Sequence, residues 1–131
     1  MADAYQDLIA WRKATELALE IYRCTRTFPK DELYGLTSQM RRAAVSVASN
    51  IAEGKGRYSR KEFAQFLYRA RGSLLELQTQ LFIARELDYL ESSASRRIKD
   101  KADEVGRILN GLTTSVQSGI ARASQEPGAR S

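Results

Sequence analysis

The sequence predicts an all-α fold, an antiparallel up-down-up-down four-helix bundle. Apolar residues recur every three or four positions along four long segments, and no segment shows the strict alternation typical of a β-strand. Pro29, Pro127 and the glycines Gly54 and Gly56 interrupt this helical pattern. Four helices of about 18 to 28 residues, joined by short loops and each with one apolar stripe, form such a bundle.

The first helix is predicted over residues 8–25. Asp7 is its expected N-cap, because a carboxylate at that position accepts hydrogen bonds from free backbone N–H groups, and Pro29 follows its end. Its apolar stripe is centred on residues such as Leu17 and is widened by Leu8 and Trp11, which we therefore expect to contribute to the core.

The second helix is predicted over residues 36–53, with Gly54 as its expected C-terminal stop. Apolar residues from Leu36 to Ile51 lie on one face of this helix. Its remaining faces hold mostly Ala and Ser. Side chains this small allow neighbouring helices to approach closely.

The third helix is expected to begin at Ser59, where Ser59 and Glu62 have the spacing of a capping box, and to continue to about residue 89. The fourth begins near the serines at 92, 93 and 95 and fades after Ile120. The polar segment 122–131 is expected to be a disordered C-terminal tail. The sequence therefore predicts a single domain over residues 1–121.

Histidine is absent from the whole chain. This excludes the usual general base at neutral pH, the Ser-His and Cys-His nucleophile systems and the commonest transition-metal ligand. The one cysteine, Cys24, shares the core phase of the first helix, so we expect a buried and inert thiol. We predict a protein that is not an enzyme and has no cofactor and no metal site.

The expected location is cytoplasmic. The first residues lack the basic and apolar regions of a signal peptide, and no apolar run approaches the ~18 residues of a membrane span. A single cysteine cannot form an internal disulfide, which fits a reducing compartment. We therefore expect no membrane partner.

The basic residues concentrate in one segment. Residues 35–81 contain eight Lys or Arg against three Glu, and this balance of +5 equals the net charge of the whole chain. Such a segment on an otherwise neutral body is typical of proteins that bind polyanions. We expect RNA or single-stranded DNA to contact, through its phosphates, Arg41, Arg57, Arg60, Lys61, Arg69 and Arg71. The alternatives are a solvated face, or an acidic protein partner on the same surface.

A polar face on the second helix contains Arg42, Ser46, Ser49 and Glu53, with Asn50 at its edge. Arg42 and Glu53 lie about 16 Å apart along the helix axis at helical rise, so they cannot pair with each other. We expect Arg42, Asn50 and Glu53 to form a structural polar network with the next helix and turn. The alternatives are direct ligand binding by Asn50 and Glu53, or solvent exposure.

A second apolar stripe runs along the third helix, about 120° from the centre of its core stripe at 100° per residue. Its members are Ala64, Tyr68, Leu75, Phe82 and Tyr89. One bundle core does not need both faces, and an exposed stripe of this size is unusual for a monomer. We expect Tyr68, Leu75 and Phe82 to form a homo-oligomer interface. In the alternative, the stripe broadens the core or is covered by the N-terminal segment with Tyr5.

Several motifs occur together in the order of a known bacterial family. They are Asp7-Leu8 with Trp11, Phe28-Pro29, Gly35 to Ala44, Ser49 to Gly54, and Gly72 to Leu81. With these motifs the chain, over residues 5–115, resembles the 23S rRNA intervening-sequence proteins, also called S23 ribosomal proteins. It departs from the family's Ser-Ile-Pro-Ser-Asn pattern at residues 46–50, where no proline is present. The missing proline restores a backbone donor and favours a straighter helix.

The resemblance implies an antiparallel four-helix bundle that assembles as a pentameric ring. It also implies RNA or DNA binding, because the related accessory variability determinant of diversity-generating retroelements is a basic pentamer that binds nucleic acid and a reverse transcriptase. Our first hypothesis is therefore a non-enzymatic homopentamer that binds RNA or single-stranded DNA. The alternative is a protein-interaction scaffold for a polymerase or a ribosome-associated partner.

Overall fold

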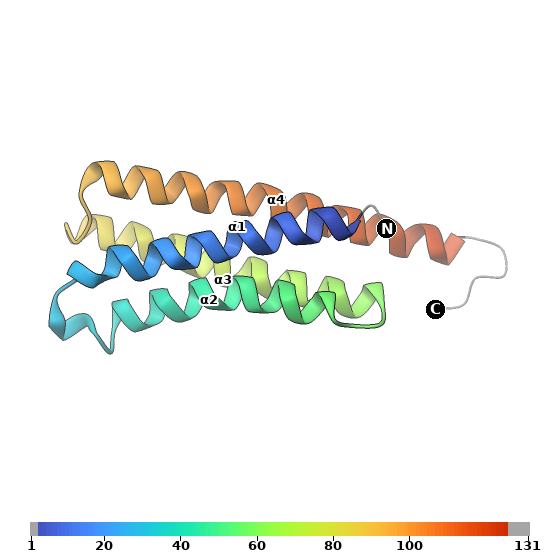
Figure 1. Ribbon diagram of the computed structural model, residues 1–131, viewed down its shortest axis with the longest axis horizontal. Helices are drawn as coiled ribbons and strands as arrows, with labels where there is room; N and C mark the ends of the chain where they lie inside the picture. The colour runs from blue at the N-terminus through green and yellow to red at the C-terminus, as the bar shows by residue number, and fades with distance from the viewer. Residues whose placement is uncertain (1–2, 126–131) are drawn as a thin grey trace.

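The computed structural model describes the backbone of residues 3–125 and the side chains of residues 7–123. Within that range the chain folds into four long α-helices without a β-strand, which confirms the predicted all-α bundle (Figure 1). The helices are α1 (Asp3–Cys24), α2 (Leu36–Lys55), α3 (Arg60–Glu86) and α4 (Ser92–Gln125).

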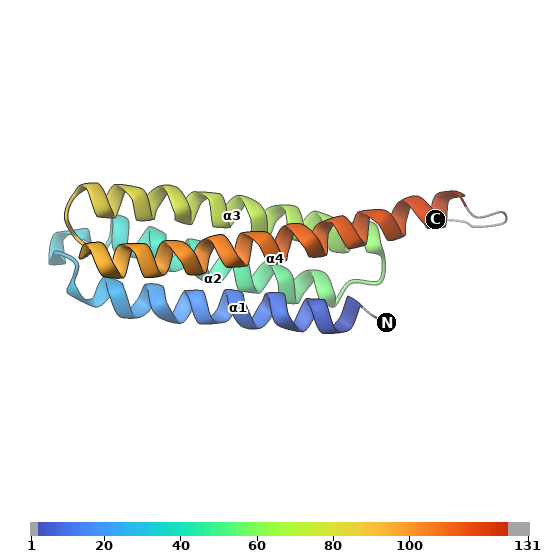
Figure 2. The ribbon, with the colours of Figure 1, turned by 90° about the horizontal axis from the view of Figure 1, so that it is seen from above.

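Consecutive helices run in opposite directions, and the two views agree on an up-down-up-down order (Figures 1 and 2). Each helix packs on its neighbour in the chain, and α1 also packs on α4. The start of α1, the α2–α3 connection and the last turns of α4 lie at one end of the bundle, which we call the α2–α3 end (Figure 1). The α1–α2 and α3–α4 connections lie at the other, which we call the α1–α2 end.

The connection between α1 and α2 consists of two short 3-10 turns, Thr25–Thr27 and Lys30–Glu32. Phe28 lies between them in an extended conformation and is buried against Tyr89, with ring centroids 5.3 Å apart. The Tyr89 hydroxyl donates a hydrogen bond of 3.0 Å to Glu32 Oε2. These contacts join the α1–α2 connection to the segment that follows α3.

The helix boundaries differ from the predictions in four places. α3 ends at Glu86, three residues before the predicted end near residue 89. Because α1 begins at Asp3, Asp7 lies inside the helix and is not its N-cap. Gly54 is still helical and α2 ends one residue later, with Gly56 as the C-cap. α4 continues to Gln125, beyond the predicted domain boundary at residue 121, and the rest of the expected tail, 126–131, lies outside the described residues.

The predicted start of α3 is confirmed. Ser59 is the N-cap, and its hydroxyl accepts a hydrogen bond of 3.1 Å from the backbone N–H of Glu62. This bond satisfies one of the N–H groups that have no partner within the helix. The cap fixes the point where the chain turns back at the α2–α3 end.

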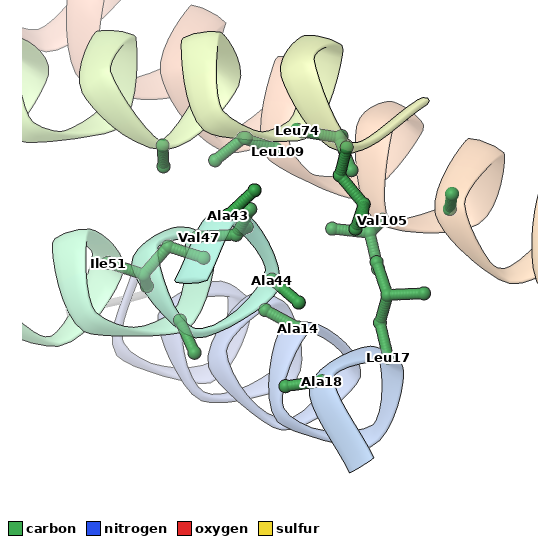
Figure 3. Packing of buried hydrophobic residues seen from close by; sticks show 14 of the residues in the cluster. Ala14, Leu17, Ala18, Ala43, Ala44, Val47, Ile51, Leu74, Val105 and Leu109 are labelled. Atoms are coloured by element: carbon green, nitrogen blue, oxygen red, sulfur yellow. The ribbon is translucent and has the colours of Figure 1, made fainter. Parts of the chain in front are cut away.

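The core fills the space between the four helices along most of their length. Figure 3 shows Leu17 of α1, Val47 of α2, Leu74 of α3 and Leu109 of α4 among its members. Small side chains line the contact between α2 and α3, and there the hydroxyls of Ser46 and Ser73 lie 2.8 Å apart. Gly54 on α2 is also packed tightly on α3, because a Cβ atom added there would lie 2.8 Å from Phe63 and from Phe66.

Among the described residues, no helix is both long enough and apolar enough to cross a membrane.

Ion pairs join the exposed faces of α1 and α4. Arg97 on α4 donates to Glu20 on α1 at 2.6 Å, and Lys13 on α1 lies 3.5 Å from Glu104 on α4. The hydrogen bond from Arg97 lowers the pKa of Glu20 below its ordinary value.

Candidate nucleic-acid interface

Two of the predicted phosphate-binding side chains are held against one aromatic ring near the α2–α3 end. The guanidinium carbon of Arg57 lies 4.6 Å from the Phe66 ring centroid, and that of Arg69 lies 4.8 Å from it. Phe66 itself is buried. The buried ring thus fixes the positions of two guanidinium groups whose N–H edges remain available.

The other predicted cations on α3 do not all face this pair, because Arg71 lines a groove between α3 and α4 with Asp103 and Arg107. Lys61 and Arg71 on α3 are exposed, and like Arg57 and Arg69 they form no ion pair within the described part of the chain. Arg60 packs over Gly119 on α4, and its guanidinium group occupies the space that a Cβ atom at this glycine would need. α3 thus places most of the predicted residues along its first half.

Arg41 does not belong to this cluster, which corrects the predicted grouping. It lies near the start of α2, about 21 Å along the helix from the end where α2 meets Arg57, at helical rise. Its Nε donates to Thr25 Oγ1 at 2.9 Å, and its guanidinium lies 4.8 Å from the Tyr22 ring centroid. The side chain therefore fastens α2 to the end of α1, where helix carbonyls attract a cation.

The cations at the start of α4 are partly neutralised. Arg97 pairs with Glu20, and Lys99 donates to Asp103 at 2.8 Å. The hydrogen bond to Asp103 raises the pKa of Lys99. The α1–α2 end is therefore a weaker candidate for phosphate binding than the α2–α3 end.

The predicted polar network includes Asn50 but not its two charged members. The Asn50 side chain donates to the carbonyl and the hydroxyl of Ser46, and Ser46 contacts Ser73. Arg42 and Glu53 form no hydrogen bond or ion pair within residues 7–123 and are exposed. Arg42 instead lines a groove of about 680 Å³ beside α2 and α3, together with Glu76.

The predicted oligomer stripe on α3 is exposed at three of its five positions. Tyr68, Leu75 and Phe82 keep 47%, 54% and 55% of their surface accessible. The stripe is shorter than predicted at both ends, because Ala64 is buried and Tyr89 lies beyond the end of α3, packed on Phe28. The side chain of Tyr5 lies outside the described side chains, so its predicted contact is not tested.

Cys24 lies at the end of α1, partly buried beside the core. Its Sγ lies 3.5 Å from the Ile21 carbonyl oxygen, to which the thiol donates. Burial raises the pKa of the Cys24 thiol to about 11. The thiol is therefore protonated at neutral pH, and the thiolate that acts as nucleophile is scarce.

We expect iodoacetamide to alkylate Cys24 slowly in the folded protein. At pH 8 a pKa near 11 leaves a thiolate fraction about a hundredfold below that of a thiol with a pKa near 9. Mass spectrometry of the folded protein and of the protein in denaturant measures the two rates. Equal rates would show that Cys24 is accessible and ionised in the fold.

One feature was missed by the sequence prediction: an apolar cleft between the start of α1 and the end of α2. It encloses about 440 Å³ and is lined by Asp7, Leu8, Trp11, Ile51, Ala52 and Lys55. Leu8 and Trp11 were expected to widen the core stripe, yet they remain 50% and 42% exposed. Their position at the edge of the stripe was the available signal. The helical period predicts which residues lie at the edge of the stripe, but it does not predict whether another helix covers them.

Among the described residues, no group of three or more His, Cys, Asp or Glu side chains is arranged to hold a metal ion. The acidic side chains near the candidate interface are either exposed, as Glu53 and Glu62 are, or paired. Asp7 is paired with Lys55 at 2.6 Å. The chemistry this surface offers is therefore recognition of an anion by fixed cations.

The sequence matches a known family, and the fold is similar to that of a solved structure. The model of the family described as "23S rRNA-intervening sequence protein" matches residues 6–111. A crystal structure of a protein of unknown function from the S23 ribosomal protein family of Bacteroides thetaiotaomicron has a TM-score of 0.77 and 20% identity, over 83% of this chain and 98% of that one. A comparison with curated proteins gave no match. The chain belongs to the 23S rRNA-intervening sequence protein family.

Proposed function

We propose that this protein is a non-enzymatic homo-oligomer, a pentamer, that binds RNA or single-stranded DNA through phosphate contacts near the α2–α3 end of each subunit. The observation that carries the proposal is the placement of Arg57 and Arg69 on the Phe66 ring without a carboxylate partner in the described chain. A guanidinium whose orientation is already fixed loses less entropy when it binds a phosphate.

The helix geometry at this end also favours an anion. α3 begins at Arg60 and carries Lys61 in its first turn, where cations oppose the positive end of the helix dipole. Each such cation costs a few tenths of a kcal/mol in the free protein. A phosphate near these residues would interact favourably with both the side chains and the helix terminus.

The oligomer part of the proposal depends on the exposed stripe of Tyr68, Leu75 and Phe82. These side chains repeat every seven residues along α3, so they lie on one face of the helix, two turns apart. Apolar strips of this kind on soluble proteins mark contacts with other chains. A closed ring would present several phosphate-binding ends to one strand, which raises affinity without new contacts.

The test is fluorescence anisotropy with labelled single-stranded RNA of mixed sequence at several salt concentrations. We expect affinity to fall steeply with salt, because each phosphate contact releases a counterion. A triple variant, Arg57→Gln, Lys61→Gln and Arg69→Gln, should reduce the slope of log affinity against log salt by about 2, at about 0.7 per contact with a single strand.

A second triple variant controls for net charge. Arg23→Gln, Arg26→Gln and Arg96→Gln remove as much charge from exposed residues at the α1–α2 end, and they should change the slope much less. Equal effects of the two triple variants, or absence of binding at low salt, would refute the proposed site. A protein partner that survives nuclease treatment in a pull-down from the native cell would instead support the scaffold alternative.

A further inference from the structure

A ring of five identical subunits needs two different contact surfaces on each subunit. One surface of a subunit meets the other surface of the next, so the α3 strip of Tyr68, Leu75 and Phe82 does not pack on itself in such a ring. The strip lies on the α3–α4 side of the bundle, because Leu75 and Phe82 each line a groove shared with α4. The second surface must be apolar and lie on another side of the bundle.

Such a surface lies over the boundary between α1 and α2. We call it the Trp11 face, and its residues line the apolar cleft and the groove farther along the same two helices: Leu8, Trp11, Tyr22, Val45 and Ala52. The four larger side chains remain between 41% and 50% exposed. α1 and α3 each pack on α2 and α4, so they occupy opposite corners of the bundle. One subunit can therefore use the strip and the Trp11 face at the same time.

The strip and the Trp11 face also lie at matching heights along the bundle. Gly54 on α2 packs against Phe66 on α3. Because these helices run antiparallel, a residue before Gly54 is level with the residue equally far after Phe66. Ala52 is therefore level with Tyr68, two residues away in each helix, and Val45 is level with the middle residue of the strip, nine residues away. Such pairs meet when neighbouring subunits stand side by side with parallel helices.

We propose that the Trp11 face of each subunit takes the α3 strip of the next subunit, with the bundles parallel to the ring axis. This inference rests on the proposed oligomer and names its second contact surface. Tyr68 packs on the indole of Trp11 at the cleft, and Leu75 packs on Val45. The Tyr68 hydroxyl already accepts a hydrogen bond from Gln117 on α4, so the ring can be buried without leaving a polar group unpaired.

Trp11 is the only tryptophan in the chain, so its fluorescence reports directly on this face. We expect the assembled protein to shield the indole from acrylamide. Leu75→Glu should reduce the mass to one subunit and, although residue 75 lies on another helix, should increase acrylamide quenching of Trp11 and shift its emission to longer wavelength. The control is Leu19→Glu, because Leu19 is equally exposed on α1 but lines neither the cleft nor the groove. It should change neither the mass nor the quenching.

A mixture of two variants tests the pairing of the two surfaces. Leu75→Glu disrupts the strip and keeps the Trp11 face, whereas Trp11→Glu disrupts the face and keeps the strip. Each variant alone should be a monomer, because a charge in the contact would lose its hydration without gaining a partner. Together they should form a complex of two subunits joined by one intact contact.

The affinity of that single contact can be measured directly. Only the Leu75→Glu protein in the mixture contains a tryptophan, so its acrylamide quenching should fall as the Trp11→Glu protein is added. If Trp11→Glu does not fold, Ala52→Glu takes its place, because Ala52 is exposed at the same cleft. Light scattering of the mixture is then the readout.

The outcomes separate this inference from the proposed function. A monomeric unaltered protein would refute both the oligomer and this contact. An oligomer that Leu75→Glu dissociates without any change in Trp11 quenching would refute the Trp11 face alone. A mixture of the two variants that stays monomeric at high concentration would also refute the pairing, and would favour contact of the α3 strip with itself.

Discussion

Gly54→Ala is expected to lower the free energy of unfolding by about 1–3 kcal/mol, although alanine is the better helix former. A Cβ atom at this position would lie 2.8 Å from Phe63 Cδ1 and 2.8 Å from Phe66 Cβ on α3. The Phe63 ring can turn away. The Cβ atom of Phe66 is fixed to the α3 backbone, so α2 and α3 must separate at this contact. Urea unfolding followed by circular dichroism measures the change.

Gly72→Ala provides the matched control, because a Cβ atom at Gly72 on α3 would meet nothing within 4 Å. The same substitution there removes only the flexibility of glycine and should raise the free energy of unfolding by about 0.4–1 kcal/mol. Similar effects at the two glycines would mean that Gly54 does not set the α2–α3 distance. Because Phe66 also holds Arg57 and Arg69, Gly54→Ala should weaken RNA binding as well.

The fold could be predicted from the sequence because its determinants are local or periodic. The three-and-four spacing of apolar residues defines four helices, and the Ser59 cap depends on residues only three positions apart. Short connections between long helices then leave the antiparallel bundle as the simplest arrangement. The helix ends were less predictable, since α1 begins and α4 ends about one and a half turns beyond the apolar pattern.

The candidate site could be predicted only in part, because it depends on which end of the bundle each residue reaches. Arg41 and Arg57 belong to the same basic segment, yet most of the length of α2 separates them, so they lie at opposite ends of the bundle. From local spacing, Asp7 was predicted to be an N-cap. Its actual partner, Lys55, lies 48 positions later in the chain, where local spacing gives no signal. Contacts between residues so far apart follow from packing and not from local spacing, so the cleft beside Trp11 became visible only in the structure.

The largest effect on assembly is expected from Leu75→Glu, which should convert the proposed oligomer into a monomer with nearly unchanged helical content. Leu75 is the middle residue of the exposed strip between Tyr68 and Phe82. Burying the three side chains against another subunit contributes several kcal/mol per interface, at ~25 cal/mol per Å² of apolar surface. A carboxylate placed there would lose its hydration without gaining a partner.

Light scattering reports the mass of the variant, and circular dichroism reports its helices. Leu19→Glu is the control, because Leu19 on α1 is 49% exposed and lies off the α3 strip. It should leave the mass unchanged. A Leu75→Glu protein that remains fully assembled would remove Leu75 from the subunit contact. Loss of helicity would instead place Leu75 among the residues that hold the bundle together, although its side chain lies outside the core that Leu74 and Leu77 occupy on the same helix.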